Sequence, residues 1–255
     1  MNRINNLFTK KKKNILSIYF TAGYPHINAT KEIIKTLDEC GVDMIEVGIP
    51  FSDPIADGSV IQESNNLAIE NGMNISLLFK QLSNIRKLTN IPIILMGYIN
   101  PVYQFGYQNF IDQLVSCGID GVILPDLPLD DYILSFKESF DKNNLSYISL
   151  ICPNTSLERI RTIDNISKGF IYVVSSSSIT GKKSNFSDDQ VEYFNRISRL
   201  KLINPTVIGF GISDKKTYDN ACKYSNGAII GTKFIESVSK NNIKESVKNY
   251  ISSIR

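Results

Sequence analysis

Three carboxylates lie close together near the start of the sequence, within residues 46–58 (EVGIPFSDPIADG). Glu46 interrupts the apolar run 44–49 (MIEVGI), and Asp53 and Asp57 follow in a stretch rich in proline and glycine. A buried carboxylate costs folding free energy unless it is paired or used in function. Glu46 therefore has two interpretations: it forms an ion pair with a cation in the core, or it performs acid–base chemistry.

The chemistry open to these carboxylates differs with their positions. Desolvation in an apolar interior should raise the pKa of Glu46, which suits it to donate and accept protons near neutral pH. Asp57, on a loop, is better placed to stay ionised and to accept a hydrogen bond. Asp53 follows a serine and precedes a proline, so we expect it to stabilise its own turn.

The elements that must hold these groups are short apolar strands that alternate with helices. The strands are near-continuous runs of Ile, Val and Leu, as expected where both faces of a parallel sheet are covered. Strands are predicted over residues 15–20, 44–49, 91–96, 119–124, 147–151, 170–174, 206–210 and 228–230. Helices are predicted over residues 30–40, 59–70, 75–88, 107–117, 129–143, 157–165, 188–202, 214–224 and 234–254. Eight β–α units without a Pro/Gly-rich linker indicate a (β/α)8 TIM barrel, a single α/β domain over residues 1–255 with extra short helices.

Length and composition agree with this fold class. The chain has 255 residues, and such barrels take about 250. Hydrophobic residues make up 42% and charged residues 21%, which allows a large core and disfavours disorder. The net charge of +3 is too small to indicate a nucleic-acid partner. We interpret the basic run 10–13 (KKKK) as a solvated segment before the first strand.

The cysteines argue against a metal centre. None of the four is in CxxC spacing, and His26 is the single histidine, so no zinc site is predicted. Dispersed thiols in a chain of this length are typical of a reduced, cytoplasmic protein. No run approaches the roughly 20 apolar residues that span a bilayer, and residues 1–7 (MNRINNL) lack the apolar core of a signal peptide.

Glycine-bearing loops after the last three strands predict a phosphate site. In barrels of this class the functional site lies at the C-terminal ends of the strands, with phosphate near strands seven and eight. Glycine lets the backbone approach an anion closely. The sequence therefore predicts a phosphorylated ligand held mainly by backbone N–H groups of Gly181, Gly211, Gly231 and Thr232. Either a phosphate contact or a solvated surface position remains open for Lys182, Lys183 and Lys233.

Two further side chains are ambiguous. Tyr172 lies within a predicted strand. Its side chain has two equally open interpretations: it packs in the core, or it places a hydroxyl near Glu46. Asp126 stands between Pro125 and the Leu127-Pro128 pair, and it either stabilises a turn or faces the site.

In the order of these motifs the chain closely resembles the tryptophan synthase alpha chain family. Residues 46–58 carry the resemblance most specifically. Supporting motifs follow in family order across essentially the whole chain: 20–25 (FTAGYP), 96–101 (MGYINP), 125–128 (PDLP), 179–181 (ITG) and 209–213 (GFGIS).

The resemblance implies a lyase of tryptophan biosynthesis. Its reaction would be retro-aldol cleavage of indole-3-glycerol phosphate to indole and D-glyceraldehyde 3-phosphate. It implies no cofactor in this chain. It also implies a partner beta chain, which holds pyridoxal phosphate and makes L-tryptophan from the indole and L-serine within an alpha2beta2 heterotetramer.

The resemblance also implies roles for individual residues. Glu46 would be the general acid–base, protonating the indole ring carbon and taking the proton of the glycerol hydroxyl. Asp57 would accept from the indole N–H, and Tyr172 matches the family tyrosine beside the glutamate. The loop after strand two would face the beta chain, and the loop after strand six would be a lid. The phosphate would lie at Thr180, Gly181, Gly211, Gly231 and Thr232. The indole pocket would be lined by Tyr19, Tyr98, Leu124 and Leu127.

The sequence departs from the family pattern at two loops. Residues 175–178 are all serine, where the family often has a bulkier or charged residue. Residues 231–233 read Gly-Thr-Lys in place of the usual Gly-Ser-Ala, although Thr232 keeps the hydroxyl. These changes bear on the lid and on communication with the partner.

Two alternatives remain. The first is another phosphate-binding barrel lyase or isomerase. A Schiff-base aldolase would need a lysine on the inner face of a strand, but Lys168 precedes strand six and Lys233 follows strand eight. The second is a non-catalytic barrel that only binds a partner, which the intact pair Glu46 and Asp57 disfavours.

Overall fold

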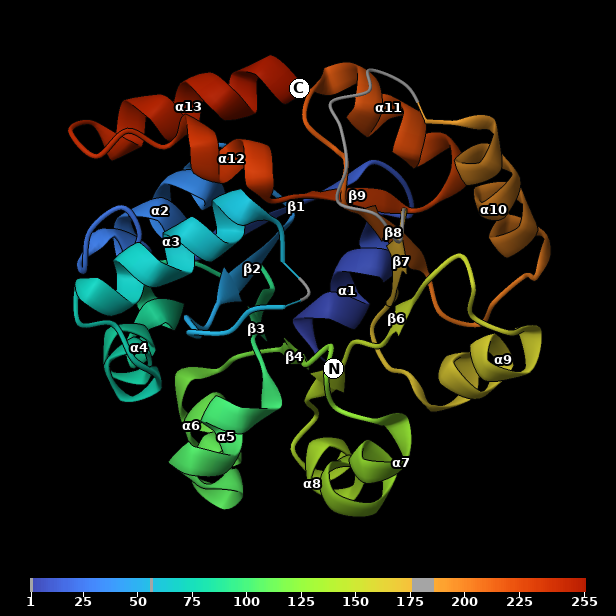
Figure 1. The fold of residues 1–255 in the computed structure, drawn as a ribbon, viewed down its shortest axis with the longest axis horizontal. Coiled ribbons are helices and arrows are strands. Elements are labelled where there is room, and N and C mark those ends of the chain that lie inside the picture. The colour runs from blue at the N-terminus through green and yellow to red at the C-terminus, as the bar shows by residue number, and fades with distance from the viewer. Residues whose placement is uncertain (1, 56, 176–185) are drawn as a thin grey trace.

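In the part of the chain that the structure describes, nine short parallel strands form the centre of the molecule, and helices surround them (Figure 1). The computed structural model describes residues 2–55, 57–175 and 186–255. The strands are β1 (Ile15–Thr21), β2 (Met44–Gly48), β3 (Ile93–Met96), β4 (Gly121–Ile123), β5 (Ser146–Tyr147), β6 (Leu150–Ile151), β7 (Ile171–Val174), β8 (Thr206–Gly209) and β9 (Gly227–Ile230). Their order in the sheet is β5-β4-β3-β2-β1-β9-β8-β7-β6.

The sheet closes on itself through the segment that contains β5 and β6. On one side, Ile148 N donates to Val122 O of β4 at 2.9 Å; on the other, Tyr172 N of β7 donates to Ser149 O at 3.0 Å. Residues 146–151 therefore bridge β4 and β7 as the fifth strand of the barrel. The (β/α)8 prediction is confirmed, and the predicted strand 147–151 corresponds to these two short elements.

The helices in the described part of the chain include most of those predicted. They are α1 (Arg3–Lys10), α2 (Ala29–Glu39), α3 (Ser59–Glu70), α4 (Ile75–Leu82), η1 (Ile85–Lys87), α5 (Ile99–Phe105), α6 (Tyr107–Cys117), α7 (Leu129–Asp131), the π-helical η2 (Tyr132–Phe136), α8 (Lys137–Lys142), α9 (Leu157–Ile166), α10 (Asp188–Arg199), α11 (Lys215–Tyr224), α12 (Thr232–Ser237) and α13 (Ile243–Ile254). Over the same residues, no helix combines the length and the apolar character that a bilayer crossing requires.

Alternation along each strand divides the apolar residues into two layers. In β1, Leu16, Ile18 and Phe20 pack in the outer cluster between sheet and helices, whereas Tyr19 belongs to the inner cluster within the barrel. Successive side chains of a strand point to opposite faces, so Ser17, between Leu16 and Ile18, shares the inner face with Tyr19. The same alternation turns Glu46 of β2 inward, between Ile45 and Val47 of the outer cluster.

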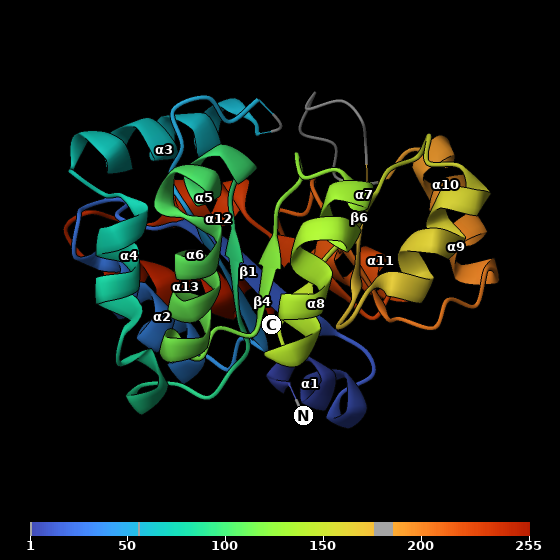
Figure 2. The ribbon, with the colours of Figure 1, turned by 90° about the horizontal axis from the view of Figure 1, so that it is seen from below.

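Helix α1 closes the barrel at the end opposite α3 (Figure 2), and the sequence prediction missed it. Ile4 is fully buried and joins Ile148 and Phe170 in the inner cluster. Asn2 caps the helix, accepting from Ile4 N at 2.8 Å. The apolar spacing of Ile4, Leu7 and Phe8 was the missed signal.

The basic run was also only partly solvated, contrary to the prediction. Lys10 is exposed in the last turn of α1. Lys11 forms an ion pair with Asp43 at 2.6 Å, and Lys13 donates to the carbonyl of Ser225 at 3.2 Å. The run therefore helps to join the N-terminal segment to the barrel.

Three other predictions are corrected at helix boundaries. No helix was predicted between residues 97 and 106, but α5 begins at Ile99, where Asp126 accepts from Ile99 N at 3.0 and 3.1 Å. The predicted helix 129–143 changes winding into π-helix at residues 132–136. The predicted helix 234–254 is two helices, because Asn242 caps α13 and starts a new helix there.

Asp120 joins α1 to the base of the barrel. Its side chain is 3% exposed and accepts from Arg3 at 3.1 Å, from Arg86 at 2.6 Å and from Ile93 N at 3.0 Å. One carboxylate thus links α1, η1 and β3. Breaking a buried ion pair by removing one partner leaves the remaining charge poorly compensated.

We predict that Asp120→Ala lowers the free energy of unfolding by about 3 kcal/mol, the usual cost of removing one partner from a buried ion pair. Urea unfolding measures the change. Asp112→Ala is the matched control, since Asp112 is exposed on α6, where its side chain accepts from Gln108; it should cost less than about 0.5 kcal/mol. Equal costs for the two variants would contradict the proposed linking role of Asp120.

Candidate active site

Glu46 lies inside the barrel, and no described residue forms an ion pair with it. It is fully buried, and Ser17 Oγ of β1 donates to its Oε1 at 2.9 Å. Its Oε2 has no hydrogen-bond partner within the described residues. Burial raises the pKa of Glu46 to about 8, against a smaller lowering by the Ser17 hydrogen bond. The structure thus contradicts the core ion-pair interpretation.

Asp57 is the second buried carboxylate of the site. It is 5% exposed, and Tyr98 Oη donates to its Oδ2 at 3.1 Å. Burial raises its pKa to about 6, again against a smaller lowering by the hydrogen bond. Asp57 is therefore more deeply buried than its loop position predicted, although a pKa of about 6 leaves it mostly ionised at pH 7.

The loop that carries Asp57 is attached to its surroundings at several points. Asp57 N donates to Pro54 O at 3.0 Å. From α3, Gln62 donates to Asp57 O at 2.9 Å, and Asn65 accepts from Phe51 N at 3.2 Å. The Phe51 ring lies 5.2 Å from that of Tyr98. Asp53 is exposed and accepts from neighbouring Ser52, and its role in stabilising the turn stays a prediction.

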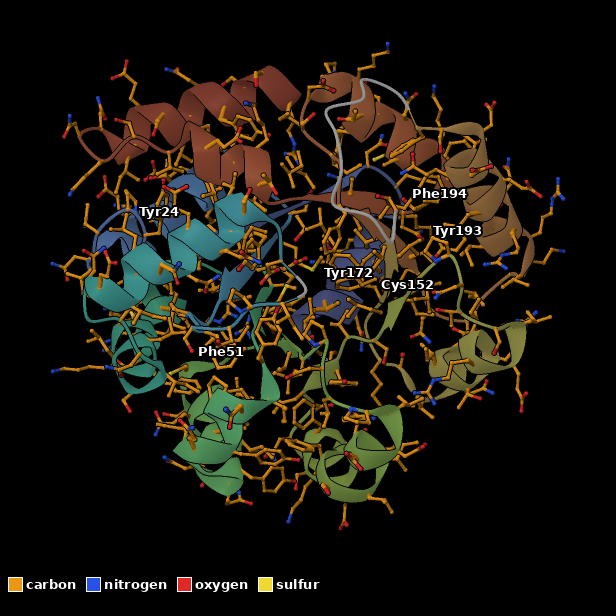
Figure 3. All side chains as sticks on the ribbon, viewed as in Figure 1. Tyr24, Phe51, Cys152, Tyr172, Tyr193 and Phe194 are labelled. Carbon is orange, nitrogen blue, oxygen red and sulfur yellow. The ribbon has the colours of Figure 1, made fainter. Side chains whose placement is uncertain are left out.

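Two buried tyrosines lie around these carboxylates. Tyr172 is near the centre of the ring of strands (Figure 3). Burial raises its pKa well above the usual value, and Glu46, Asp57 and Tyr19 add smaller effects of the same sign. Burial likewise raises the pKa of Tyr19, with Asp57 as the next cause. The Tyr172 hydroxyl is thus close enough to Glu46 to interact electrostatically, but no hydrogen bond joins the two within the described residues.

Glycines make room for both tyrosine hydroxyls. A methyl group at Gly48 would collide with the hydroxyl of Tyr19, and one at Gly209 would collide with that of Tyr172. Gly48 follows Glu46 by two residues and faces the same side of β2. Small residues at these points therefore let two large side chains fill the top of the barrel beside Glu46.

The predicted indole-pocket residues divide between the two layers. Tyr19 belongs to the inner cluster, whereas Leu124 and Leu127 pack in the outer cluster. The prediction for these two leucines is corrected, because alternation after β4 turns Ile123, not Leu124, inward. Met96 of β3 also packs against the inner cluster. Tyr98 lies beside Asp57, a hydrogen-bonding position that the sequence did not indicate.

The predicted phosphate residues that are described lie at the ends of β8 and β9. Gly211 has φ +72°, and the preceding Phe210 has φ +69°, an unusual conformation for a residue other than glycine. Gly231 precedes α12, of which Thr232 is the first residue. Lys233 forms an ion pair with Glu236 at 2.8 Å on the surface, which favours its solvated interpretation. Thr180, Gly181, Lys182 and Lys183 lie outside the described residues.

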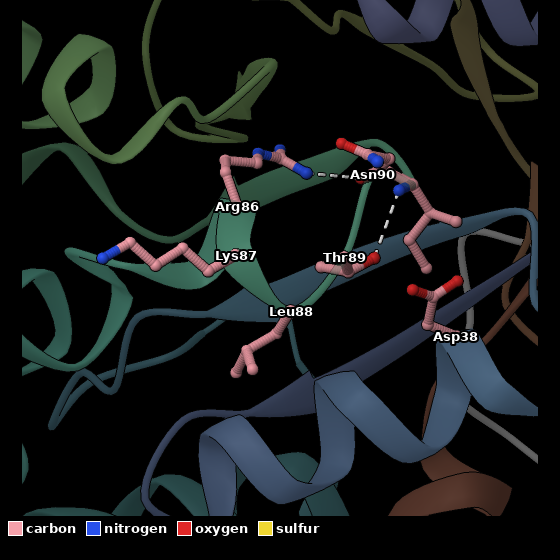
Figure 4. A pocket seen from close by; sticks show the side chains of 7 residues that line it. Asp38, Arg86, Lys87, Leu88, Thr89 and Asn90 are labelled. Carbon is pink, nitrogen blue, oxygen red and sulfur yellow. Dashed lines mark hydrogen bonds between the residues drawn. The ribbon is translucent and has the colours of Figure 1, made fainter.

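Two hollows elsewhere on the surface are unconnected with these groups. One, of about 440 Å³, lies at the base of the barrel before β3 and is lined by Arg86, Thr89 and Asn90, among others (Figure 4). Arg86 there is already committed to Gly118 O, Ile91 O and Asp120. The other, of about 540 Å³, lies along α10. In the described part of the chain, no three His, Cys, Asp or Glu side chains are grouped to hold a metal ion.

Comparison with known proteins decides the family. A family model described as "Tryptophan synthase alpha chain" matches residues 5–254. The chain belongs to the tryptophan synthase alpha chain family. Among its curated relatives, the tryptophan synthase alpha chain of Flavobacterium psychrophilum is 53% identical over 254 residues, covering 100% of both chains. That of Parabacteroides distasonis is 53% identical over 92% of each chain.

Solved structures of alpha chains share the fold. Tryptophan synthase subunit alpha from Legionella pneumophila has a TM-score of 0.90 at 31% identity, covering 100% of this chain and 97% of that one. The A-subunit from Pyrococcus furiosus has a TM-score of 0.87 at 32% identity, covering 95% and 98%. The family resemblance drawn from residues 46–58 and the supporting motifs is confirmed.

Ser17 is the site residue that sequence reasoning missed. The signal was present, because Ser17 is the one polar residue in the run 15–20 (ILSIYF) apart from the Tyr19 hydroxyl. A polar group in a buried strand needs a partner, and that partner is Glu46.

We predict that Gly48→Ala lowers the free energy of unfolding by about 1–3 kcal/mol, because the new methyl group overpacks the barrel against Tyr19. In a Tyr19→Phe background the hydroxyl is gone, so the same substitution should cost at least about 1 kcal/mol less. Urea unfolding of the four chains gives this coupling. If the costs of Gly48→Ala and Tyr19→Phe are strictly additive, the Tyr19 hydroxyl does not need the space that Gly48 leaves.

Proposed function

We propose that this chain is the alpha subunit of tryptophan synthase and cleaves indole-3-glycerol phosphate to indole and D-glyceraldehyde 3-phosphate. Family membership supports this substrate. The observation that carries the proposal is the pair of buried carboxylates with different proton affinities, Glu46 with a pKa of about 8 and Asp57 with a pKa of about 6. Near pH 7 one is mainly neutral and the other mainly ionised, as an acid and an anion acting together require.

Glu46 would begin the reaction as a neutral acid. It donates its proton to C3 of the indole ring, and the positive charge that develops toward the ring nitrogen is stabilised by the Asp57 carboxylate, which accepts from the N–H. The ionised Glu46 then takes the proton of the glycerol hydroxyl next to the bond to be broken. As the carbonyl forms, the carbon–carbon bond breaks, its electrons restore the indole ring, and Glu46 is neutral again.

The rest of the substrate would extend from Glu46 toward the ends of β8 and β9. Tyr19, Tyr98, Met96 and Ile123 would provide apolar walls for the indole. Backbone N–H groups of Gly211, Gly231 and Thr232, together with Thr180 and Gly181, would hold the phosphate. Tyr172 would fix the space beside Glu46, because its hydroxyl fills the gap that Gly209 leaves.

A tryptophan synthase beta chain would be the partner, in an alpha2beta2 heterotetramer. Ile55 is apolar and 83% exposed on the loop that carries Asp57, which supports contact of this loop with the partner. Pyridoxal phosphate would be bound by the beta chain, and no cofactor by this one. We further propose that residues 1–255 act as one domain, in the cytoplasm, without nucleic acid or membrane as a partner.

The alternative lyases and isomerases have less support. Schiff-base chemistry needs a desolvated lysine, and no lysine within residues 2–55, 57–175 and 186–255 is buried. A non-catalytic barrel would have no use for a fully buried carboxyl group that forms no ion pair with any described residue, because such a group destabilises a fold.

We predict that Glu46→Gln reduces indole release by about a hundredfold to ten-thousandfold, because the acid–base group is gone. Asp57→Asn should reduce it by about a hundredfold, since the developing charge loses its anion. Indole formed from indole-3-glycerol phosphate, with and without a beta chain, is the measurement. Asp53→Asn, on the same loop but exposed, is the control and should stay within about twofold. No activity in the unmodified chain under either condition would refute the proposed reaction.

Glu46→Gln should also stabilise the fold at neutral pH. Because burial raises the pKa of Glu46 from 4.5 to about 8, the folded chain holds a proton that the unfolded chain loses. This group therefore costs stability as pH rises from about 4.5 to about 8, reaching about 3 kcal/mol at pH 7. Glutamine carries no such cost, so urea unfolding at pH 7 should show an inactive variant at least as stable as the original. Strong destabilisation would instead indicate that Glu46 is a structural group.

We predict a bell-shaped dependence of kcat/KM on pH. Activity should fall below pH of about 6 as Asp57 is protonated, and above pH of about 8 as Glu46 loses the proton that it must donate. Asp57→Asn should lose the acid limb and keep the basic limb. A basic limb that disappears in Asp57→Asn would mean that the two assignments are exchanged.

A further inference from the structure

The hydrogen bond from Ser17 makes the two oxygens of Glu46 different. Ser17 is fully buried, and its Oγ lies 2.9 Å from Glu46 Oε1. Tyr19 of β1 pairs with Glu46 in the sheet, and Ser17 pairs with Met44. Ser17 thus faces the same inner side as Tyr19, the residue opposite Glu46, but lies two residues closer to the base of the barrel. Oε1 is engaged there, whereas Oε2 has no partner within the described residues.

The hydroxyl of Ser17 acts as the donor in this contact. A serine hydroxyl carries one proton, and an ionised carboxylate can only accept. Among the described residues the structure gives that proton no acceptor other than Glu46 Oε1. When Glu46 is neutral, the same donation keeps Oε1 as an acceptor, so the carboxyl proton belongs on Oε2. A buried polar atom without a partner calls for an explanation, and a substrate that receives this proton provides one.

We propose that Ser17 is a positioning residue that reserves Oε1 of Glu46 for itself and leaves Oε2 as the oxygen that exchanges protons with the substrate. This inference rests on the proposed cleavage reaction. In the first step the Oε2–H bond breaks and a bond from that proton to the indole carbon forms. In the second, Oε2 takes the proton of the glycerol hydroxyl. The carboxyl group thus returns to its starting state, and Ser17 keeps its own proton throughout.

The surroundings of Glu46 indicate how Ser17 affects its protonation. Tyr19 of β1 and Tyr172 of β7 interact electrostatically with Glu46, and both also interact with Asp57, which accepts from Tyr98. Tyr19 and Tyr172 are neutral at working pH, because burial raises the pKa of both, and Asp57 is mainly an anion at pH 7. Ser17 is therefore the one group shown to favour the ionised form of Glu46. Removing its hydroxyl must raise the pKa of Glu46 further.

The test compares Ser17→Ala, which lacks the hydroxyl, with Ser17→Thr, which keeps it. Ser149→Ala is the matched control, since Ser149 is also buried in the barrel wall but its hydroxyl has no partner in the described residues. The carbonyl stretching band of the neutral Glu46 carboxyl, identified by its absence in Glu46→Gln, is followed against pH by infrared difference spectroscopy. The pH dependence of indole release is measured on the same chains.

Ser17→Ala should move both the loss of the carboxyl band and the basic limb of kcat/KM to higher pH by about one unit, because a hydrogen bond to a charged group is lost. Its kcat at the plateau should fall by about tenfold while KM stays within about twofold, since Ser17 does not contact the substrate. Ser17→Thr and Ser149→Ala should follow the unmodified chain.

The outcomes separate this inference from the proposed reaction. If the unmodified chain releases indole but Ser17→Ala shows neither shift, or Ser17→Thr shifts as Ala does, the positioning role of Ser17 is wrong and the reaction stands. If the unmodified chain releases no indole, the reaction is wrong. In that case the infrared band still decides whether Ser17 controls the protonation of Glu46.

Discussion

The burial of one carboxyl group, to which the described part of the chain offers no counter-ion, is the constraint on which the rest of this structure depends. Glu46 is fully enclosed within the barrel, and its Oε2 has no partner among the described residues. The fold tolerates this because Glu46 can stay protonated, and therefore neutral, inside the barrel. Burial of this carboxyl group costs folding free energy, but it also gives Glu46 the raised pKa that an acid catalyst needs. A pKa of about 8 keeps a proton available at neutral pH.

The surrounding elements keep this environment apolar and fixed. Helix α1 closes the base of the barrel with Ile4, and Asp120 ties that helix to η1 and β3. On the other side, Tyr19 and Tyr172 fill the interior beside the carboxyl, in space that Gly48 and Gly209 leave open. Asp57 lies nearer the loops and is stabilised by Tyr98. Two carboxyl groups of one motif thus differ in proton affinity because Glu46, which is fully buried, is desolvated more completely than Asp57, although each accepts one hydrogen bond.

Much of this arrangement could be predicted from the sequence because it depends on local patterns. Apolar runs placed the strands, and alternation along them put Glu46 on a buried strand followed by a loop carrying Asp57. Some of the residues that the sequence misplaced depend on contacts between distant segments. Ile99 starts a helix because Asp126 accepts its N–H across 27 positions of the chain, and Ser17 matters because Glu46 lies on the neighbouring strand. Leu124 was assigned to the pocket through an error of one residue, which in a strand exchanges the inner and outer faces.

The most direct test of the account is the titration of Glu46 itself in the substrate-free chain. Glutamate labelled with ¹³C at the side-chain carboxyl allows this titration to be followed by NMR, and the resonance is assigned by its loss in Glu46→Gln. We predict a midpoint near pH 8, since burial raises the pKa of Glu46 to about 8. A midpoint near 4.5, the ordinary value for a glutamate carboxyl, would show that Glu46 is solvated or paired, and would contradict the claim that enclosure by the barrel creates the acid.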